Sequence, residues 1–300
     1  MCGHSMVGPF ELGAVTVGDC FSLVDELPNE SVDVVVTSPP YWGQRFSKGM
    51  GNEDDPREYL SHLVRLFEKL LPKMKVSGTV WINIGDAYNT PVNWRSDDYT
   101  FSTLGADRRG LSKENTAYTK PRAKRRAFMA ASEELWLNYG NLLALPYRLV
   151  TGLCDVGFLF RGEVIWRKLN PMPEGRCRRP HRQHEGIYLF SKTESHCFRV
   201  TPPVGTVWEF ANEPSNGVRH YSRFPVELPR RCIRAHGRFG KDVVILDPFS
   251  GSGSTGVAAL ELGCSYIGFE IDESLVVASN QRLHRSVPRA DAAQMVLLSD

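Results

Sequence analysis

The stretch Lys241–Asp272 constrains the fold of this chain more than any other. It opens with Val243–Leu246, an apolar run that ends at Asp247-Pro248 and predicts a strand buried on both faces of a parallel sheet. A turn built on three glycines comes next, namely Gly251, Gly253 and Gly256. Thr255–Leu262 then has helical character. Strand, glycine turn and helix start therefore follow one another in the order that binds nucleotides.

A second strand, Ser265–Phe269, ends on Glu270, which lies 19 residues after Gly251. An acid at this point can accept hydrogen bonds from both hydroxyls of a ribose. The glycine spacing also matches the dinucleotide fingerprint, so a nicotinamide-dependent oxidoreductase stays an alternative. No lysine follows the glycines to reach phosphates, which excludes a P-loop.

The position of this stretch predicts the order of the whole fold. Only 28 residues follow Asp272, and a doubly wound sheet needs several more strands, so these strands must come earlier in the chain. We predict an α/β fold with a seven-stranded, mostly parallel, Rossmann-like sheet that is circularly permuted. A single domain is expected over residues 14–286, with an insertion at 89–140 and a tail at 287–300.

The decisive upstream element is Ser31–Thr37, a β-branched run that predicts another buried parallel strand. It ends in Ser38-Pro39-Pro40-Tyr41-Trp42. Two successive prolines make this loop rigid at the place where an α/β sheet presents its ligands. We expect this strand to lie beside Val243–Leu246, which would set Ser38 near Gly251 across one cleft.

Periodicity predicts the other elements. Short strands are expected at Val15–Val17 and Gly78–Ile84, an antiparallel pair at Phe158–Arg167 and Gly186–Ser191, and a strand or turn at Val207–Phe210. Helices are expected at Cys20–Leu27, Arg57–Leu71 and Leu142–Val156 and within His220–Ile233.

The net charge of +2 conceals three basic segments. Arg95–Arg126, Arg161–Arg182 and Arg219–Lys241 carry nine, seven and seven basic residues against four, two and one acids. Such segregation predicts a polyanion partner on one side of the molecule, although solvated basic loops would show the same pattern.

Cysteine usage and apolar runs indicate the compartment. The seven cysteines are odd in number and form no C-x-x-C pair, which favours reduced thiols in the cytosol. The first residues lack a signal pattern and no apolar run reaches the length of a membrane span, so a cytoplasmic location without membrane contact is expected. Cys177, His181, His184 and Cys197 fit no common zinc spacing, and we predict no metal.

The two loops in this order, Ser38–Trp42 first and Asp247-Pro248-Phe249-x-Gly251-x-Gly253 second, resemble the amino-methylating DNA methyltransferases that use S-adenosylmethionine. The resemblance is to their permuted beta group and spans about Val15–Arg285. Smaller matching signatures are Gly18-Asp19, Ile165–Pro171, His184–Ile187, Phe190–Lys192 and Phe224–Leu228.

The resemblance implies S-adenosylmethionine as cofactor and double-stranded DNA as partner, in a bacterial or phage setting where a cognate restriction endonuclease can be a functional partner. The implied catalytic residues are Ser38, Pro39, Pro40, Tyr41 and Trp42. The implied cofactor-binding residues are Asp247, Phe249, Gly251, Gly253, Ser254, Thr255 and Glu270, with Asp19, Phe224 and Pro225. Basic residues expected to contact DNA are Lys124, Arg125, Arg126, Arg176, Arg178 and Arg179.

The chemistry of an exocyclic amine explains the proline loop. Its lone pair is delocalised into the ring, so the nitrogen is a poor nucleophile. If Ser38 Oγ and the Pro39 carbonyl each accept one amino hydrogen, the lone pair can be aimed at the methyl group. The base must be flipped out of the duplex, and Tyr41 with Trp42 is expected to offer it a stacking surface.

The residue before the prolines predicts the product. Ser-Pro-Pro-Tyr is typical of relatives that methylate cytosine N4, whereas adenine N6 enzymes more often have Asp in place of Ser38. Cytosine N4 is therefore predicted, with adenine N6 as the alternative. A cytosine C5 enzyme is disfavoured because no cysteine follows a proline.

The sequence departs from the beta group in one place. The group reads its target between the antiparallel pair and the Phe-Pro segment, but here Lys192 and His220 are only 28 positions apart. We therefore predict that the 89–140 insertion takes over target reading. A catalytically silent DNA-binding homologue remains a further alternative.

Overall fold

The computed structural model describes most of the chain in seven ranges, 5–43, 49–89, 134–138, 140–171, 179–199, 205–212 and 224–286. It divides into two compact units. The first joins Met1–Gly85 to Leu145–Asp300, and the second is Asp86–Ala144. The predicted 89–140 insertion falls within the bounds of the second unit, and residues 90–133 of it lie outside the described residues.

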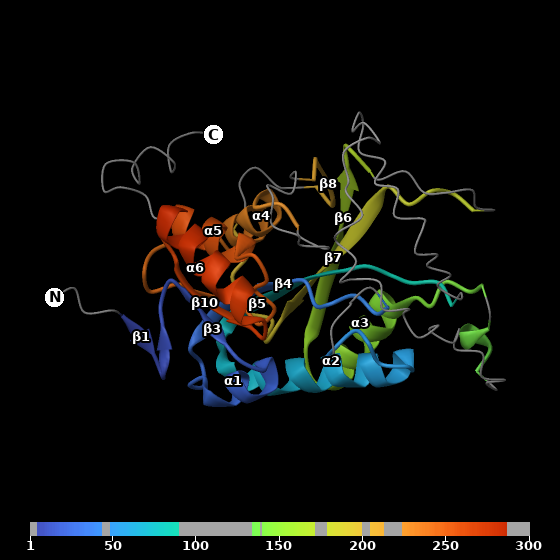
Figure 1. Ribbon diagram of the computed structural model, residues 1–300, viewed down its shortest axis with the longest axis horizontal. Helices are drawn as coiled ribbons and strands as arrows, with labels where there is room; N and C mark the ends of the chain where they lie inside the picture. Colours follow the sequence, from blue (N-terminus) through green and yellow to red (C-terminus); the bar gives the residue numbers. More distant parts are fainter. Residues whose placement is uncertain are drawn as a thin grey trace, which may run out of the picture. The chain divides into compact units, whose positions relative to one another are not determined.

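The first unit is built on an eight-stranded sheet with the order β3-β10-β9-β4-β5-β7-β6-β8 (Figure 1). Its strands are β3 (Ala14–Val17), β4 (Val32–Thr37), β5 (Met74–Ile84), β6 (Leu159–Lys168), β7 (His184–Ser191), β8 (Val207–Phe210), β9 (Val244–Asp247) and β10 (Ser265–Glu270). Strand β7 runs antiparallel to both of its neighbours, and the other pairs are parallel. A separate hairpin pairs β1 (Met6–Val7) with β2 (Phe10–Glu11).

The predicted mostly parallel α/β sheet is confirmed, with one strand more than the seven expected. The additional strand is β8, which pairs in parallel with β6 at the sheet edge. Its Trp208 and Phe210 are buried, and the Trp166 ring stacks on Phe210 with ring centroids 4.9 Å apart. A four-residue strand has too little periodicity to be separated from a turn by pattern alone, and here tertiary packing decides.

Helices cover both faces of this sheet (Figure 1). One layer holds α1 (Cys20–Glu26), α2 (Pro56–Leu70) and α3 (Leu145–Asp155), and the other holds α4 (Glu227–His236), α5 (Ser254–Glu261) and α6 (Glu273–Ser286). Helix α6 was not predicted, because it buries only Ser279 and Leu283 and so shows little apolar periodicity. Across the described ranges, no helix combines the length and apolar character needed to cross a membrane.

Strands β4 and β9 lie side by side, as predicted. They pair in parallel, with Val34 opposite Ile245 and Val35 opposite Leu246. From β4 the chain passes through α2 to β5 on one side, and from β9 it passes through α5 to β10 on the other. The strand order reverses at this point, and in open α/β sheets the ligand crevice forms outside the carboxyl ends of such strands.

In the second unit, two short segments of the described chain pair with each other. The Asn89 amide donates to the Asn141 carbonyl at 2.9 Å, and the Leu143 amide donates to Ala87 at 2.9 Å. The buried Asn89 side chain also donates to the Leu137 carbonyl. These bonds hold together the two ends of the segment that contains the predicted insertion.

His236, the last residue of α4, is completely buried in the first unit. Within the described part of the chain, neither of its ring nitrogens has a hydrogen-bond partner. Burial lowers the pKa of His236 to about 4, the charges of Arg238, Lys75 and His196 act in the same direction, and Asp33 opposes them. The histidine is therefore neutral in the folded protein near pH 7.

Acid should destabilise the fold through this residue. A depressed folded pKa means that the unfolded chain binds the proton first, so stability is lost as pH falls from about 6.5 toward 4, by about 1.4 kcal/mol per pH unit. Between pH 7 and pH 5, the free energy of unfolding of the wild type should fall by about 2 kcal/mol relative to His236→Leu. Urea titrations at both pH values measure this difference.

The comparison with His236→Leu also removes a competing effect. Burial raises the pKa of Asp247 to about 6, so its carboxyl protonates in the folded state first and stabilises the fold as pH falls. Asp247 is present in both proteins, and its contribution cancels. Parallel pH profiles for the two proteins would contradict the assignment to His236.

Candidate active site

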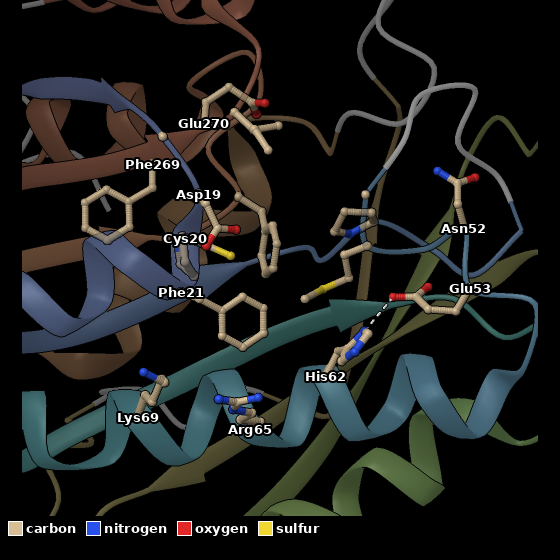
Figure 2. A pocket seen from close by; sticks show the side chains of 17 residues that line it. Asp19, Cys20, Phe21, Asn52, Glu53, His62, Arg65, Lys69, Phe269 and Glu270 are labelled. Atoms are coloured by element: carbon tan, nitrogen blue, oxygen red, sulfur yellow. Dashed lines mark hydrogen bonds and ion pairs between the residues drawn. The ribbon is translucent and has the colours of Figure 1, made fainter.

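A cavity of about 730 Å³ opens at the carboxyl ends of β3, β10, β9 and β4, with α2 along one side (Figure 2). Its lining includes Gly18 and Asp19 after β3, Pro40 after β4, Phe249 after β9, and Glu270 and Ile271 at the end of β10. Figure 2 shows Asp19 and Glu270 on the wall opposite His62, Arg65 and Lys69 of α2. The volume lies in the range of pockets that enclose a cofactor-sized molecule.

Glu270 is oriented by two backbone amides. Its Oε2 accepts a hydrogen bond from the Gly251 amide at 2.9 Å, and its Oε1 accepts from the Asp272 amide at 3.0 Å. The residue is 5% exposed and borders the cavity. Each carboxylate oxygen keeps a further lone pair, so Glu270 can accept two hydroxyl hydrogens from a bound molecule.

The glycine turn shapes the wall behind Glu270. Gly251 and Gly253 have φ angles of +52° and +78°, a backbone region that side chains disfavour. Gly256 permits a close approach, since a Cβ there would lie 2.5 Å from the Tyr266 ring and 2.6 Å from Leu283. Ser254 is buried, with its Oγ 3.2 Å from Arg282 Nη1 of α6.

Asp247, Thr37 and Thr255 form a buried hydrogen-bonded cluster, here called the Asp247 clip. It connects β9 to β4 and to α5. Asp247 Oδ1 accepts from Thr37 Oγ1 at 2.6 Å and from the Phe249 amide at 3.0 Å. Its Oδ2 accepts from Thr255 Oγ1 at 2.7 Å. The side chains of Asp247 and Thr255 are thus bound within the protein, behind the cavity and not on its surface.

The proline loop, Ser38–Trp42, is held by hydrogen bonds to Tyr59 of α2 and to Glu53, which precedes that helix. Ser38 is half-buried, whereas Pro39 and Pro40 are buried. The Tyr59 hydroxyl donates to the Pro40 carbonyl at 2.9 Å, a bond that does not use the Pro39 carbonyl. Ser38 therefore follows β4 at the edge of the crevice on a loop with little freedom to move.

The predicted stacking surface needs a correction. Trp42 is only 9% exposed, and its Nε1 donates to the Glu53 carbonyl at 2.9 Å. The Glu53 side chain in turn accepts from the Gly51 amide at 2.7 Å and lies 3.0 Å from His62 Nδ1. Trp42 is thus a buried support of the loop, because the chain folds back over it, and it offers no open face to a base.

Tyr41 sits over the end of β5. Its ring packs so closely on Gly85 that a Cβ there would lie 2.6 Å from Tyr41 Cε2. Its hydroxyl lies 3.0 Å from Glu185 Oε2 and 3.1 Å from Asn83 Oδ1. Burial raises the pKa of Tyr41 well above its usual value, and the charge of Glu185 adds to this effect.

The model of the N6/N4 family, described as DNA methylase, matches residues 32–281 of this chain. This range includes the proline loop, the glycine turn and Glu270. The chain belongs to the N6/N4 DNA methylase family. It is accordingly a DNA methyltransferase.

Two curated relatives of this DNA methylase match over nearly their full length. The type II methyltransferase M.SmaI of Serratia marcescens is 33% identical over 288 residues, with 90% of each chain covered. M.Cfr9I of Citrobacter freundii, also a type II methyltransferase, is 33% identical and covers 92% of this chain and 89% of its own.

Solved structures share the fold of this methylase. The PvuII DNA methyltransferase, described as cytosine-N4-specific, superimposes with a TM-score of 0.64 at 20% identity, covering 97% of this chain and 96% of its own. TTHA0409, a DNA modification methylase of Thermus thermophilus solved with S-adenosyl-L-methionine, gives a TM-score of 0.61 at 21% identity. It covers 92% of this chain and 94% of its own.

The predicted cofactor residues of the methylase occupy three kinds of place. Asp19, Phe249 and Glu270 border the cavity. The glycine turn, the Asp247 clip and Ser254 shape the structure behind it. Phe224 is half-buried against the main hydrophobic core and Pro225 is buried, and neither lines the cavity.

Most of the predicted DNA-binding residues lie outside the described residues. These are Lys124, Arg125, Arg126, Arg176 and Arg178. Arg179 is described, half-buried, with Nη1 3.3 Å from the Pro180 carbonyl.

Sequence reasoning missed four polar residues around the proline loop, namely Glu53, Asn83, Lys168 and Glu185. Lys168 and Glu185 do stand inside two of the short family signatures, which was a usable signal. Asn83 looks like an ordinary strand residue, and Glu53 lies in a loop without periodicity, so no pattern marked either of them.

Proposed function

We propose that this DNA methyltransferase moves the methyl group of S-adenosylmethionine to the N4 amine of a cytosine flipped out of double-stranded DNA. The observation that carries the proposal is the adjacency of β4 and β9. It places the rigid loop with the half-buried Ser38 at the same edge of the crevice as the cavity. The cavity is large enough for a cofactor and has the acidic Glu270 at its rim.

The donor set of the cavity fits this cofactor. Glu270 can accept hydrogen bonds from the two ribose hydroxyls, and Phe249 and the exposed Ile271 provide apolar contact for a purine. Asp19 caps α1 through the Ser22 amide at 3.2 Å and keeps acceptor capacity for an adenine amine. When bound, S-adenosylmethionine supplies an electrophilic methyl group on a sulfonium.

The protein's own contribution is positioning. Ser38 Oγ and the Pro39 carbonyl each accept one hydrogen of the target amine, which draws the nitrogen toward a tetrahedral shape and turns its lone pair toward the methyl group. Both acceptors are held before the reaction, since the prolines and the Tyr59 bond restrict the loop. No covalent intermediate with the protein is needed.

The target base must leave the duplex to reach Ser38. With Trp42 buried, Tyr41 is the aromatic residue of the loop that remains to contact the base. One base–aromatic stack contributes about 1–3 kcal/mol, comparable to the few kcal/mol that unstacking costs. The segregated basic segments support duplex DNA as the partner, and similarity to type II methyltransferases supports a cognate endonuclease as a functional partner.

The product should be N4-methylcytosine. Ser38 stands where adenine-specific relatives more often carry an acid, and a neutral hydroxyl presents a single acceptor oxygen to the amine. Mass spectrometry of nucleosides from DNA methylated by the purified protein measures the product directly. Finding N6-methyladenine alone would establish the adenine alternative, and finding neither base would favour a silent DNA-binding homologue.

A further inference from the structure

The end of the proline loop is supported by a turn at residues 49–53, just before α2. The Trp42 indole Nε1 donates to the Glu53 carbonyl at 2.9 Å. The next amide, of Gly43, donates to the Gly51 carbonyl at 2.8 Å. Gly51 has a φ of +89° and lies so close to the loop that a Cβ there would be 3.0 Å from a backbone oxygen of the loop. The place of the proline loop therefore depends on the place of the 49–53 turn.

The Glu53 side chain holds this turn against α2. Its Oε2 accepts from the Gly51 amide at 2.7 Å, and its Oε1 lies 3.0 Å from Nδ1 of His62 on α2. The Glu53 side chain is only 7% exposed, so water competes little for these contacts. Without the carboxylate, the turn would lose both its internal bond to the Gly51 amide and this attachment to α2.

The same contacts form part of the cavity wall (Figure 2). Glu53 and His62 both border the cavity, and the dashed line in Figure 2 marks the contact between them. Pro40 of the proline loop borders the cavity as well. The contacts of Glu53 therefore join the wall of the proposed cofactor site to the loop that is proposed to bind the target amine.

We propose that Glu53 is a positioning residue for methyl transfer, which sets the place of the proline loop through the 49–53 turn and Trp42. This role rests on the proposed contact between the loop and the target amine. Two prolines make the loop rigid, but they do not set its place relative to a bound cofactor. The reacting atoms must approach to about 3–3.5 Å, and an error of about 1 Å can cost roughly 100-fold in rate. A rigid loop is effective only where it is held, and Glu53 holds it from the cavity wall.

Glu53→Ala should slow methyl transfer without preventing either substrate from binding. Loss of the carboxylate releases the turn, and Trp42 with it, so the loop spends less time in its productive place. We expect the single-turnover rate constant to fall by roughly 10-fold, whereas the dissociation constants for duplex DNA and S-adenosylmethionine should stay within about threefold of the wild type. Glu53→Gln keeps an acceptor for the Gly51 amide and should restore the rate to within about threefold of the wild type.

Hydrogen exchange of the cofactor-free protein gives a second measurement that does not depend on activity. The Gly43 amide, which is bonded to the Gly51 carbonyl, should exchange faster in Glu53→Ala than in the wild type. The amide of the buried Phe67, inside α2, should exchange at the wild-type rate. A general loss of stability would instead speed exchange at both amides, and unchanged exchange at Gly43 would show that Glu53 does not hold the loop.

Trp42→Phe tests the route from Glu53 to the loop. This variant removes the Nε1 donor and should slow transfer by itself. In the Trp42→Phe background, Glu53→Ala should cause a smaller loss than in the wild type, because part of the connection has already been removed. Losses that simply add would contradict the route through Trp42.

The matched control is Asp25→Ala. Asp25 also pairs with a basic residue of α2, since its Oδ2 lies 2.6 Å from Lys69 Nζ, and Lys69 borders the same cavity. In the part of the chain that the structure describes, this pair makes no hydrogen bond to the proline loop, so the rate should stay at the wild-type level. An unchanged rate in Glu53→Ala, or a loss that appears only as weaker cofactor binding, would overturn the positioning role.

Ser38→Ala separates a failure of this role from a failure of the proposed function. If Ser38→Ala slows transfer and Glu53→Ala does not, the loop acts on the amine but Glu53 does not position it. If neither variant slows transfer, the loop does not contact the amine, and the proposed function is wrong at this point.

Discussion

Ser38→Ala is expected to lower the single-turnover rate of methyl transfer by roughly 10- to 100-fold. The substitution removes the Oγ that we propose accepts an amino hydrogen from the target base, an interaction that would strengthen as the nitrogen becomes tetrahedral. Affinity for S-adenosylmethionine should remain within about twofold, because the cavity lining does not include Ser38. Rapid-quench measurement of labelled methyl transfer, paired with calorimetry for the cofactor, separates the two quantities.

Ser31→Ala is a suitable control for this experiment. Ser31 precedes the same strand and donates to the Pro28 carbonyl at 2.7 Å, far from the crevice at the opposite end of β4. Its removal should leave the rate of transfer unchanged. If Ser38→Ala weakened cofactor binding as much as it slowed transfer, Ser38 would belong to the cofactor site, and the proposed contact with the amine would be wrong.

Glu270→Ala is expected to weaken S-adenosylmethionine binding by about 1–3 kcal/mol, or roughly 5- to 150-fold in the dissociation constant. The change removes the proposed acceptors for the ribose hydroxyls. It also leaves the Gly251 amide without its partner, so part of the loss will come from the glycine turn. Isothermal calorimetry on the wild type and the variant measures the effect.

Glu270→Gln distinguishes these two contributions. Its amide oxygen can still accept from the Gly251 amide, while its amide nitrogen brings a donor to a place where ribose hydroxyls need acceptors. A loss of affinity close to that of the alanine variant is therefore expected, with a smaller change in Tm. Glu273→Gln, at the exposed start of α6, is the matched control and should bind normally. Normal binding by both Glu270 variants would move the ribose contact elsewhere.

The sheet could be predicted from the sequence because its central strands are rich in β-branched and other apolar residues. Val32–Thr37 and Val244–Asp247 are buried at every position, and each ends in a turn of distinctive composition. Buried parallel strands have this appearance whatever surrounds them, so their pairing and the crevice at their ends followed from local pattern. Helix α6 escaped prediction, and β8 could be predicted only as a strand or a turn, because the burial of both depends on neighbours far away in the chain.

Within the site, local chemistry predicted Ser38 and Glu270 as candidates, since Ser38 directly follows β4 and Glu270 ends β10, and both strands end at a ligand crevice. Sequence could not decide which of the adjacent residues Tyr41 and Trp42 faces inward, because that depends on how Gly51 and Glu53 fold back over the loop. Nor could it show that Asp247 serves a buried clip. The Asp247 contact spans more than two hundred residues of chain, since its partner is Thr37.

The polar network around Tyr41 shows most clearly what the sequence predicts and what only tertiary contacts decide. The sequence by itself determined that a hydroxyl, two prolines and a tyrosine leave β4 together. Only the tertiary structure brought Asn83, Lys168 and Glu185 from three other strands to that tyrosine. The register of β7 against β5 and β6 decides this meeting, since a shift of one residue would turn Glu185 to the opposite face of the sheet. The hydrogen bonds of the Tyr41 hydroxyl are therefore a property of the assembled sheet.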